Sequence, residues 1–368
     1  MKISRSKLLV FLIGSLGDSV VAIPALRAIR RRYPDWEIVL FQNRPFTDLV
    51  QASEVVPDDL VDRSIDYFSG SFNRSGPIGF LRVWRRLRRE RFEAAAYLVI
   101  SERRNSAVIR DRIFFRSCGI SKLLGFHSFS SEELFPTDPA LPTESEAVRK
   151  LKRLERDGLV WDENDLQTPL MSFSDVEAGR ICEWLRANRK KPNAPLIAIA
   201  PGTKKPACAW PTENFIELGS RLIRETAGEL VVVGGKSEKE LGDELTSAWG
   251  EGINAAGSSS VRDAANLLSK CDLYVGVDTG TTHLAAAAGT PWFAIFHQRD
   301  NPGQWHPLGD GVILTADPVA CAGCRLVECP FPEHPCMKGI SADKAWNALK
   351  PFTNKVLAAK CQRALLSK

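Results

Sequence analysis

The sequence lacks the features of a membrane-spanning or exported protein. No apolar run approaches the ~20 residues that a membrane helix needs, and the apolar run near the start, residues 8–13, has only the length of a buried strand. The basic start continues into a glycine-containing turn and a charged stretch, without the small-residue cleavage site of a secretory signal. These absences predict a soluble, cytoplasmic protein.

A strong excess of one charge is also missing. The 368 residues include 49 Lys and Arg against 44 Asp and Glu, which gives a formal net charge of +5. This mild basicity does not make nucleic acid the expected partner. Hydrophobic residues at 44% and charged residues at 25% exclude wholesale disorder, and at roughly 150 residues per domain the length predicts two domains.

Clustered cysteines are limited to one stretch of the chain. Five of the nine cysteines stand singly, which is typical of a reduced, cytosolic protein: Cys118, Cys182, Cys208, Cys271 and Cys361. The other four follow the tetrathiolate spacing Cys321-x2-Cys324-x4-Cys329-x6-Cys336. This spacing predicts a structural zinc or iron site, in which His334 could replace one ligand. The alternative is a cysteine-rich loop that is packed without a metal.

What the sequence does contain is an alternation of short apolar runs with longer amphipathic stretches, the pattern of parallel α/β structure. The expected strands are residues 8–13, 38–42, 95–100, 196–200, 230–234, 253–255, 273–277, 292–295 and 312–314. Most are apolar at consecutive positions, as expected when helices cover both faces of a sheet. Helices are expected behind the cap residues Ser174 and Ser260.

The domain boundary is expected in the strand-free stretch from 126 to 196, which holds several prolines and a charged patch around residues 149–157. We therefore predict an N-terminal domain with its linker at residues 1–170, and a C-terminal domain ending in a helix at residues 171–368. Both are expected to be Rossmann-like, doubly wound parallel-sheet domains that face a cleft. Ligands of such domains bind at the carboxyl ends of the strands.

The first expected strand ends in a glycine-containing turn, Gly14-Ser15-Leu16-Gly17-Asp18, followed by a helix. Glycine allows a tight turn and the close approach of a ligand. The helix N-terminus favours negative charge, so Asp18 should remain ionised and able to accept a proton. The alternative is a plain helix cap. The Gly-x-Gly-x-x-Gly fingerprint of dinucleotide sites is absent.

Three strand ends in the second half carry candidate residues for an anionic ligand. Free N–H groups and hydroxyls where residues 273–277 meet the next helix predict a diphosphate site that needs no metal, at Asp278, Thr279, Gly280, Thr281, Thr282 and His283. The turn after residues 196–200 adds Thr203, Lys204 and Lys205, whose lysines could neutralise phosphate charge. Glu238 follows Gly234 and Gly235, where an acidic residue can hold ribose hydroxyls.

Taken together, these segments resemble glycosyltransferase family 9, the heptosyltransferases of lipopolysaccharide core assembly. The resemblance rests on Gly-Ser-Leu-Gly-Asp18, on Trp210-Pro211 after a Pro-Gly turn, on Gly234-Gly235, and on Asp278-Thr-Gly-Thr-Thr-His283-Leu-Ala-Ala-Ala, in the family's order from about residue 8 to residue 340. It implies a GT-B architecture that binds the acceptor on the N-terminal domain and the sugar nucleotide on the C-terminal one. It also implies inverting transfer of a heptose from ADP-heptose to a lipopolysaccharide core acceptor, with no cofactor required for catalysis.

The resemblance assigns roles to individual positions. Asp18 matches the catalytic base, and Gly14, Ser15 and Gly17 form the loop beside the acceptor. Asp278, Thr279 and Gly280 match positions that contact the diphosphate, His283 matches a site residue that follows them, and Glu238 matches the ribose-binding position. An acceptor that is a glycolipid implies a location in the cytoplasm, or peripherally on the cytoplasmic face of the inner membrane.

One position departs from the family pattern. Members commonly carry a lysine two residues before the Trp of the third segment, and here that position is Cys208. Lys204 or Lys205 would then have to supply the missing charge. Two alternatives stay open: a protein glycosyltransferase of the same family, and a sugar-nucleotide-binding protein without transfer activity.

The stretch from Ile78 to Arg91 predicts an amphipathic helix with apolar residues along one face and arginines over the rest. Phe80, Leu81, Trp84 and Leu87 are expected on the apolar face. Packing on the core through that face is the expected role. An alternative is that the arginines hold phosphate groups or the surface of an anionic membrane.

Overall fold

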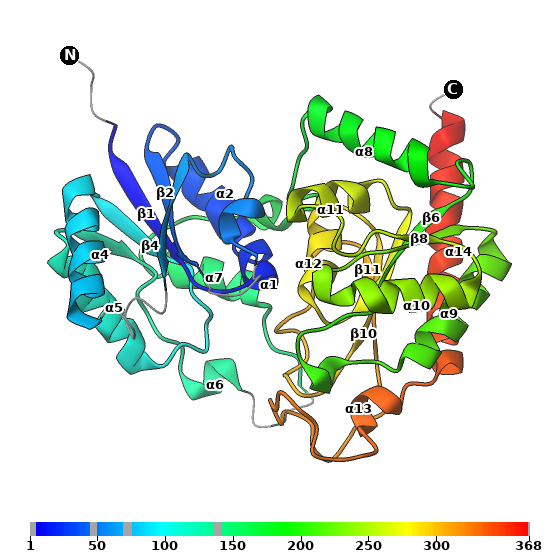
Figure 1. Cartoon of the computed structure of the whole chain (residues 1–368). Helices are drawn as coiled ribbons and strands as arrows, with labels where there is room; N and C mark the ends of the chain where they lie inside the picture. The colour runs from blue at the N-terminus through cyan, green and yellow to red at the C-terminus, as the bar shows by residue number, and fades with distance from the viewer. Residues whose placement is uncertain (1–4, 45–49, 69–75, 136–137, 139–140, 367–368) are drawn as a thin grey trace. The chain divides into compact units, whose positions relative to one another are not determined.

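The protein folds into two compact units, each built on its own parallel sheet (Figure 1). The structure is a computed structural model, and it describes residues 5–44, 50–68, 76–135, 138 and 141–366. The first unit comprises Met1–Thr137 and Thr143–Gln167, and the second comprises Asp138–Pro142 and Thr168–Lys368.

The sheet of the first unit has five parallel strands in the order β3-β2-β1-β4-β5. The strands are β1 Lys7–Leu12, β2 Glu37–Arg44, β3 Arg63–Phe68, β4 Ala94–Tyr97 and β5 Lys122–Leu124. The chain builds outward from β1 to β3 and then returns to β4 on the other side of β1. The topological switch point, where doubly wound folds bind ligands, therefore lies at the carboxyl ends of β1 and β4.

Helices cover both faces of this sheet. On one face, α4 (Gly76–Glu90) and α5 (Asn105–Ser117) pack on the sheet. They contact side chains of alternate strand residues such as Phe11, Phe41 and Tyr97. The other face carries α2 (Ile23–Arg32) and α7 (Glu146–Glu155), as Figure 1 shows. The shorter helical segments are α1 (Leu16–Val20), η1 (Ala52–Glu54), α6 (Ser131–Leu134) and η2 (Glu163–Leu166).

The sheet of the second unit has six parallel strands in the order β11-β10-β9-β6-β7-β8. The strands are β6 Leu196–Ala200, β7 Glu229–Val232, β8 Ile253–Asn254, β9 Leu273–Val277, β10 Trp292–Phe296 and β11 Gly311–Thr315. The chain runs outward from β6 to β8 and then crosses to β9 on the other side of β6. The switch point of this sheet lies at the carboxyl ends of β6 and β9.

One face of the second sheet packs on α9 (Thr212–Thr226), α10 (Lys239–Trp249) and the C-terminal α14 (Ala342–Leu366). The helices α8 (Asp175–Asn188), α11 (Val261–Ser269) and α12 (Gly280–Ala287) pack together on the other face. Short helical turns are η3 (Pro206–Cys208), η4 (Lys236–Glu238) and α13 (Pro335–Lys338). In the described part of the chain, no helix combines the length and apolar character needed to cross a bilayer.

The predicted strands and helix caps are confirmed, with end residues that differ by a few positions. Ser174 accepts a hydrogen bond from Glu177 N, whose carboxylate accepts in return from Ser174 N, and Ser260 caps α11 through Asp263 N. Two strands were missed, β3 and β5. They are the two edge strands of their sheet. An edge strand has a neighbour on one side only, so its sequence can include more polar residues than that of a central strand.

Two other expectations are corrected. The charged patch at residues 149–157, expected to mark the strand-free boundary region, lies largely in α7, a helix of the first unit in which Glu146, Arg149, Lys150 and Arg153 are fully buried. In α4, Leu87 is buried as expected, but Phe80 is 43% exposed and Leu81 is 39% exposed. The face of α4 that packs on the sheet centres on Leu87, and the N-terminal apolar residues extend beyond it.

Candidate functional site

In the first unit, Asp18 lies in the turn that follows β1, at the switch point of the sheet. Its Oδ2 accepts a hydrogen bond from Ser15 N at 2.9 Å, and the Ser15 hydroxyl lies 3.4 Å from the same oxygen. Within the described residues, no hydrogen bond reaches Asp18 Oδ1. The carboxylate is therefore fixed through one oxygen, and the other can accept a proton from a bound hydroxyl.

Backbone geometry holds this turn in place. Gly14 has a φ of +153°, and a Cβ at this position would lie 2.3 Å from the Cβ of Asp18. Gly14 N also donates to Asn43 Oδ1, 3.2 Å away at the end of β2. Glycine is needed here because both the dihedral angle and the space beside Asp18 exclude a side chain.

Buried charged residues of α7 form hydrogen bonds with the backbone of the segment after β4, which lies at the same switch point. Lys150 Nζ donates to Leu98 O at 3.0 Å, and Arg153 donates to Val99 O. Glu146 accepts from Ser101 N at 2.7 Å and pairs with Lys150 at 3.2 Å. Each buried charge has a partner, as burial requires. These residues fix the backbone beside the Asp18 turn.

In the second unit, the residues predicted to bind the sugar nucleotide lie together at the carboxyl ends of the strands. The neighbouring strands β10, β9, β6 and β7 end at this edge. The segments that follow them carry, respectively, His297, the turn Asp278–Thr282, the turn Gly202–Lys205, and Gly234–Glu238. Because the carboxyl ends of parallel strands all lie on the same side of the sheet, segments that are far apart in the sequence form one surface.

The turn between β9 and α12 uses part of its hydroxyl set internally. Thr282 is fully buried; its hydroxyl donates to Val277 O at 2.5 Å and contacts the Tyr274 hydroxyl at 2.9 Å. Tyr274 also lies 3.3 Å from Thr281 Oγ1. The Thr282 side chain therefore stabilises the turn, whereas the hydroxyl-bearing residues Thr279 and Thr281 are partly exposed. The N-terminus of α12 adds its positive end of the helix dipole.

Asp278 forms a buried ion pair with His297, which follows β10. His297 Nε2 lies 2.7 Å from Asp278 Oδ2, although the ring N–H is not aligned for a regular hydrogen bond. The His297 side chain is only 2% exposed. The buried His283 also lies near Asp278, and its ring contacts Trp305 edge to face.

The electrostatics of this pair favour a charged histidine. Burial alone would lower the pKa of His297, but Asp278, together with the Cys208 side chain, raises it to about 10. The Arg299 N–H, 3.3 Å from His297 Nδ1, favours the neutral ring and is outweighed by the closer carboxylate. For Asp278, burial acts to raise the pKa, and the charges of His297, His283 and Lys205 bring it below its ordinary value.

The two lysines of the β6 turn lie near different acidic residues. Burial lowers the pKa of Lys204, and the nearby Glu238 opposes this effect. Lys205 is close enough to Asp278 to lower the pKa of that carboxyl group. The Glu238 carboxylate accepts from Gly235 N at 2.6 Å and from the Ser237 hydroxyl at 2.7 Å. The turn thus places one cation toward β7 and one toward β9.

Gly202 brings the β6 turn against Glu238. A Cβ on Gly202 would lie 2.1 Å from Glu238 Cγ, so Gly202→Ala must displace the Glu238 side chain. From the ribose-binding role that the resemblance implies for Glu238, we expect this variant to weaken binding of ADP about tenfold, as loss of one hydrogen bond to a charged group would do. Isothermal titration with ADP measures the effect. Gly179→Ala, on α8 with open space around its Cβ, is the control and should bind normally.

Cys208 lies next to this site. It ends η3, is buried, and contributes to the raised pKa of His297. The neighbouring Ala207 bonds to the loop 321–336 at two points, its N–H donating to Val327 O and its carbonyl lying 3.0 Å from His334 Nε2. The cysteine-rich loop therefore packs on the turn that carries Cys208.

The four cysteines of that loop are free thiols and lie near one another. Burial raises the pKa of Cys336, and the charges of the other three thiols add to the effect. Among the described residues, however, no three of these sulfurs lie within 4.8 Å of one another. As placed, the thiols do not form a single metal site, since four sulfurs at ~2.3 Å from one ion must be closer than this. The zinc or iron site stays a prediction.

A different group has the spacing of metal ligands in the described part of the chain. Ligand atoms of Asp278, His297 and Asp300 all lie within 4.8 Å of one another. Asp300 pairs with Arg299 at 2.5 Å, and His297 pairs with Asp278. In this cluster, each of the two carboxylates is therefore paired with a cationic side chain of the protein.

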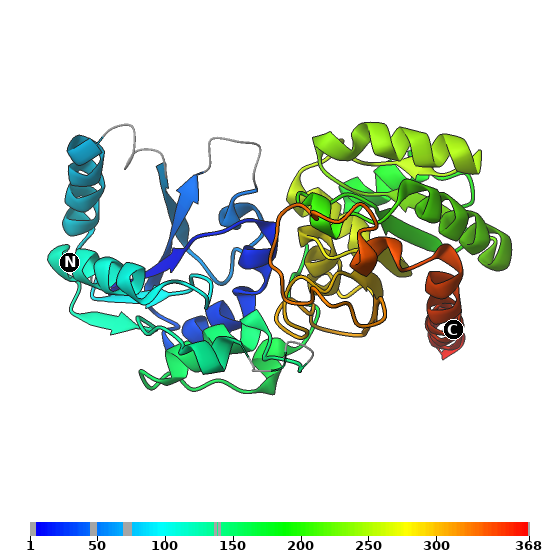
Figure 2. The same cartoon turned by 90° about the horizontal axis from the view of Figure 1, so that it is seen from below.

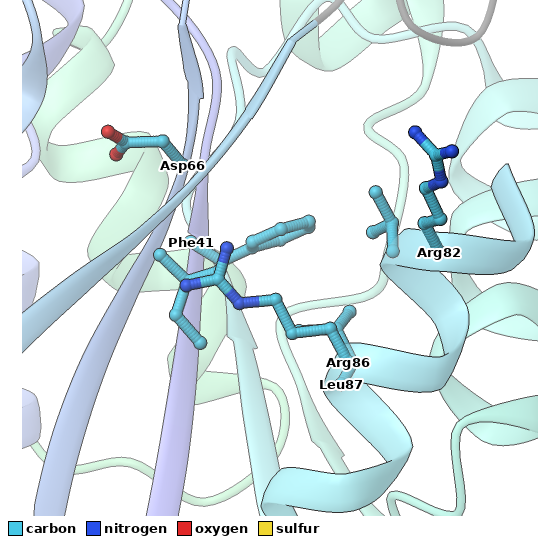
Figure 3. Close-up of a pocket in the computed structure, with 7 residues that line it drawn as sticks. Phe41, Asp66, Arg82, Arg86 and Leu87 are labelled. Atoms are coloured by element: carbon cyan, nitrogen blue, oxygen red, sulfur yellow. The ribbon is translucent and has the colours of Figure 1, made fainter. Parts of the chain in front are cut away.

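A cavity of about 130 Å³ lies elsewhere in the first unit, between α4 and strands β2 and β3 (Figure 3). Its walls are Phe41, Ile65, Asp66, Arg82, Val83, Arg86 and Leu87. The side chain of Arg86 extends across it toward Phe41, as Figure 3 shows. None of the predicted site residues lines this cavity.

Sequence reasoning missed His297. The residue follows an apolar strand, as the other site residues do, but the adjoining segment has no glycine and no helix start to mark it. Its position directly after β10 is the one available signal, because that strand end lies beside the Asp278 turn in a doubly wound sheet.

The fold and the site together define a two-unit α/β protein of GT-B type, with polar and glycine-containing turns at the switch point of each sheet. The sequence model of glycosyltransferase family 9 (heptosyltransferase) matches residues 80–334. This match covers more than half of the chain, and the protein belongs to glycosyltransferase family 9.

Individual relatives agree with this assignment. Lipooligosaccharide heptosyltransferase 2 of Haemophilus influenzae is 30% identical over 152 residues, which are 38% of this chain and 43% of the relative. The aligned region thus spans less than half of that relative. A glycosyl transferase family 9 structure from Veillonella parvula aligns with a TM-score of 0.73 at 18% identity, over 96% of this chain and 99% of the other. The structure of ADP-heptose lps heptosyltransferase II from E. coli gives a TM-score of 0.66 at 20% identity, over 95% and 99%. These structures share the fold.

Proposed function

We propose that this protein transfers a heptose from ADP-heptose to a core acceptor of lipopolysaccharide, with inversion at the anomeric carbon. Family membership supports this reaction, as do the names of the relatives. The observation that carries the proposal is the cluster at the switch point of the second sheet. There a helix N-terminus and two lysines are suited to the phosphates of a nucleoside diphosphate, and the Glu238 carboxylate is suited to its ribose hydroxyls.

In the proposed reaction, Asp18 acts as the general base. The acceptor hydroxyl loses its proton to Asp18 as its oxygen attacks the anomeric carbon of the donor. The bond from that carbon to the diphosphate oxygen breaks in the same step, and ADP leaves. The single-oxygen anchoring of Asp18 by Ser15 supports this role, because the other oxygen stays available for the proton.

The departing ADP gains negative charge, which the second unit would stabilise. The N–H groups of Thr279–Thr281 and the hydroxyls of Thr279 and Thr281 are suited to the diphosphate, and Glu238 is suited to the ribose. His297 acts as a positioning residue: it holds Asp278 in place and balances its charge beside the phosphates. Stabilisation of charge that develops in the transition state is typically the largest contribution to such reactions.

Lys205 is proposed to replace the family lysine that is Cys208 here. It lies near Asp278, whereas Lys204 lies near Glu238. We expect Lys205→Ala to lower kcat by about tenfold to a hundredfold, in line with the removal of one charge-stabilising donor. Lys190→Ala, an exposed lysine before β6, should leave kcat unchanged. Equal activity of the Lys205 and Lys190 variants would show that another group supplies the charge.

The test of the reaction is a donor screen read by mass spectrometry. The protein is incubated with ADP-, GDP- and UDP-sugars and with truncated lipopolysaccharide acceptors, including ADP-heptose among the donors. The proposal predicts an acceptor that is heavier by one heptose, with ADP-heptose alone as donor. A hexose product would overturn the donor assignment.

A sugar-nucleotide-binding protein without transfer activity is the second candidate, and the cysteine at position 208 is the observation that favours it. It predicts ADP binding with no product from any donor and acceptor.

Two further proposals concern the surroundings of the reaction. We propose a location in the cytoplasm or peripherally at the inner membrane, because the acceptor is a glycolipid. We also propose that Cys321, Cys324, Cys329 and Cys336 take up a structural zinc or iron ion after rearranging, with no part in catalysis. Metal analysis of protein purified without chelator tests the second point, and less than a tenth of an equivalent of either metal would exclude it.

A further inference from the structure

The outer surface of α4 and α5 in the first unit combines exposed apolar side chains with arginines. We call this surface the α4–α5 face. Its apolar members are exposed as follows: Ile78 64%, Phe80 43%, Leu81 39%, Ile109 48% and Ile113 64%. Large apolar side chains gathered on a surface, rather than scattered singly, indicate an interaction site.

The two helices form one continuous surface. The ring of Phe80 in α4 contacts the ring of Phe114 in α5 in a tilted arrangement, with centroids 5.1 Å apart. The Trp84 indole donates to the Ser117 hydroxyl at 3.0 Å, and Arg88 donates to Ser117 O at 3.2 Å. Figures 1 and 2 both show α4 and α5 side by side at the edge of the first unit.

The charge of this face has one sign. Helix α4 carries five arginines, Arg82, Arg85, Arg86, Arg88 and Arg89, and α5 carries three, Arg110, Arg112 and Arg116. Five of these arginines have a local role: Arg82 and Arg86 line the cavity, Arg88 donates to Ser117 O, Arg110 pairs with Asp111, and Arg116 donates to Ser121 O. Among the described residues, no hydrogen bond or ion pair engages Arg85, Arg89 or Arg112.

The acidic residues of the two helices do not cancel this charge. Glu90 pairs with Arg63 at 2.6 Å and with Lys7 at 3.2 Å. Asp111 is buried and accepts from the Tyr97 hydroxyl at 2.9 Å, as well as from Arg103 and Arg110. Both carboxylates are thus occupied at the inner sides of the helices.

We propose that the α4–α5 face docks on an anionic lipid bilayer. Apolar side chains can enter the boundary between headgroups and acyl chains, while the arginines around them contact lipid phosphates. Charge complementarity selects this occupant. A second exposed apolar group, Leu326, Val327 and Phe331, lies on a loop that also carries Glu328 and Glu333, and those carboxylates would oppose an anionic surface.

Docking goes beyond the proposed transfer reaction and is tested without it. Co-sedimentation with vesicles of phosphatidylcholine, with and without phosphatidylglycerol, measures the binding of the full chain. We expect binding only to the anionic vesicles, with a decrease as salt is raised, because exposed charges are screened. No binding to anionic vesicles at low salt would overturn the proposal.

Paired variants separate the two contributions. Arg85→Glu with Arg89→Glu, both exposed positions of α4, should lower the partition coefficient at least tenfold, since each basic residue near an anionic surface contributes attraction. Ile78→Ser with Ile113→Ser should also lower it about tenfold through lost apolar contact. The matched control is Val176→Ser with Arg186→Glu on α8 of the second unit, also exposed. The control should bind as the parent protein does, and an equal loss in the control would contradict the assignment to α4 and α5.

Two readouts keep this proposal distinct from others. Sedimentation velocity tests whether the face instead joins two copies of the chain; a dimer that Ile78→Ser with Ile113→Ser abolishes would overturn the lipid assignment. Transfer to a soluble, deacylated acceptor should be unchanged in the docking variants. Normal vesicle binding with no transfer from any donor would leave docking intact and overturn the proposed reaction.

Discussion

Replacement of Asp18 by asparagine is expected to lower the rate of heptose transfer by 10²–10⁴-fold, the usual contribution of a general base. Asparagine keeps the size of the side chain and its oxygen can still accept from Ser15 N, which lies 2.9 Å from Asp18 Oδ2. The amide of the variant cannot accept the proton of the acceptor hydroxyl. Single-turnover transfer from ADP-heptose, followed by mass spectrometry, measures the rate.

The binding of ADP provides the control for this variant. Asp18 belongs to the first unit, and the residues proposed to hold the nucleotide belong to the second. We therefore expect the same ADP affinity by isothermal titration for the parent and for Asp18→Asn. A variant that transfers at more than a tenth of the parent rate would exclude Asp18 as the base.

Replacement of His297 by glutamine is expected to have the largest effect on stability. It removes the cation from the buried ion pair and leaves Asp278 charged without its partner. Breaking a buried pair in this way costs about 3–5 kcal/mol, which corresponds to a decrease in Tm of roughly 10 °C for a unit of this size. Differential scanning calorimetry measures the change.

A double variant tests whether the two residues act as a pair. Asp278→Asn combined with His297→Gln removes both charges, so the loss should be well below the sum of the two single losses. Additive losses would show that the ion pair does not stabilise the fold. ADP affinity should fall with either single variant, because the turn that carries Asp278 is proposed to contact the diphosphate.

The pH dependence of this stabilisation follows from the raised pKa of His297. The group has a pKa of about 10 in the folded chain against an ordinary value of 6.5. Its contribution is therefore complete below about pH 6.5 and is lost as the pH rises toward 10. Asp278 has a lowered pKa, so its contribution is lost only in strong acid. The Tm difference between the parent and His297→Gln should be largest near pH 5–6 and should shrink toward pH 10.

Sequence patterns predicted the sheets well where strands are buried on both faces. The central strands, such as residues 196–200 and 273–277, are continuous apolar runs, and the structure confirms them. The edge strands β3 and β5 were missed because one side of each is exposed, and their sequences include residues such as Arg63, Asp66 and Lys122.

Charge was a poor guide to the linker. The patch at residues 149–157, together with the prolines around it, was used to place the domain boundary, yet it lies largely in the packed helix α7, where Lys150 and Arg153 are fully buried. Their charges are satisfied by backbone carbonyls of the segment after β4 and by Glu146. The two carbonyls are some 50 residues away in the sequence, so no local pattern reveals them, and only Glu146, four residues before Lys150, is a local partner.

The candidate site shows the same division. The glycine-containing turns at Asp18, Gly202 and Asp278 could be recognised because a tight turn after a strand leaves a local sequence pattern. His297 could not, since its function depends on a contact with Asp278 across neighbouring strands. The internal role of the Thr282 hydroxyl was also missed, although its partners Val277 O and Tyr274 lie in the preceding strand β9, because the sequence does not show that the Tyr274 hydroxyl reaches the turn.

The central claim is that the nucleoside diphosphate binds at the switch point of the second sheet. A crystal structure of the protein with ADP tests it most directly. We expect the diphosphate against the first turn of α12, in contact with Thr279 and Thr281, and the ribose hydroxyls on Glu238. ADP bound instead in the first unit, or on the second unit away from the ends of β6, β7 and β9, would contradict the account.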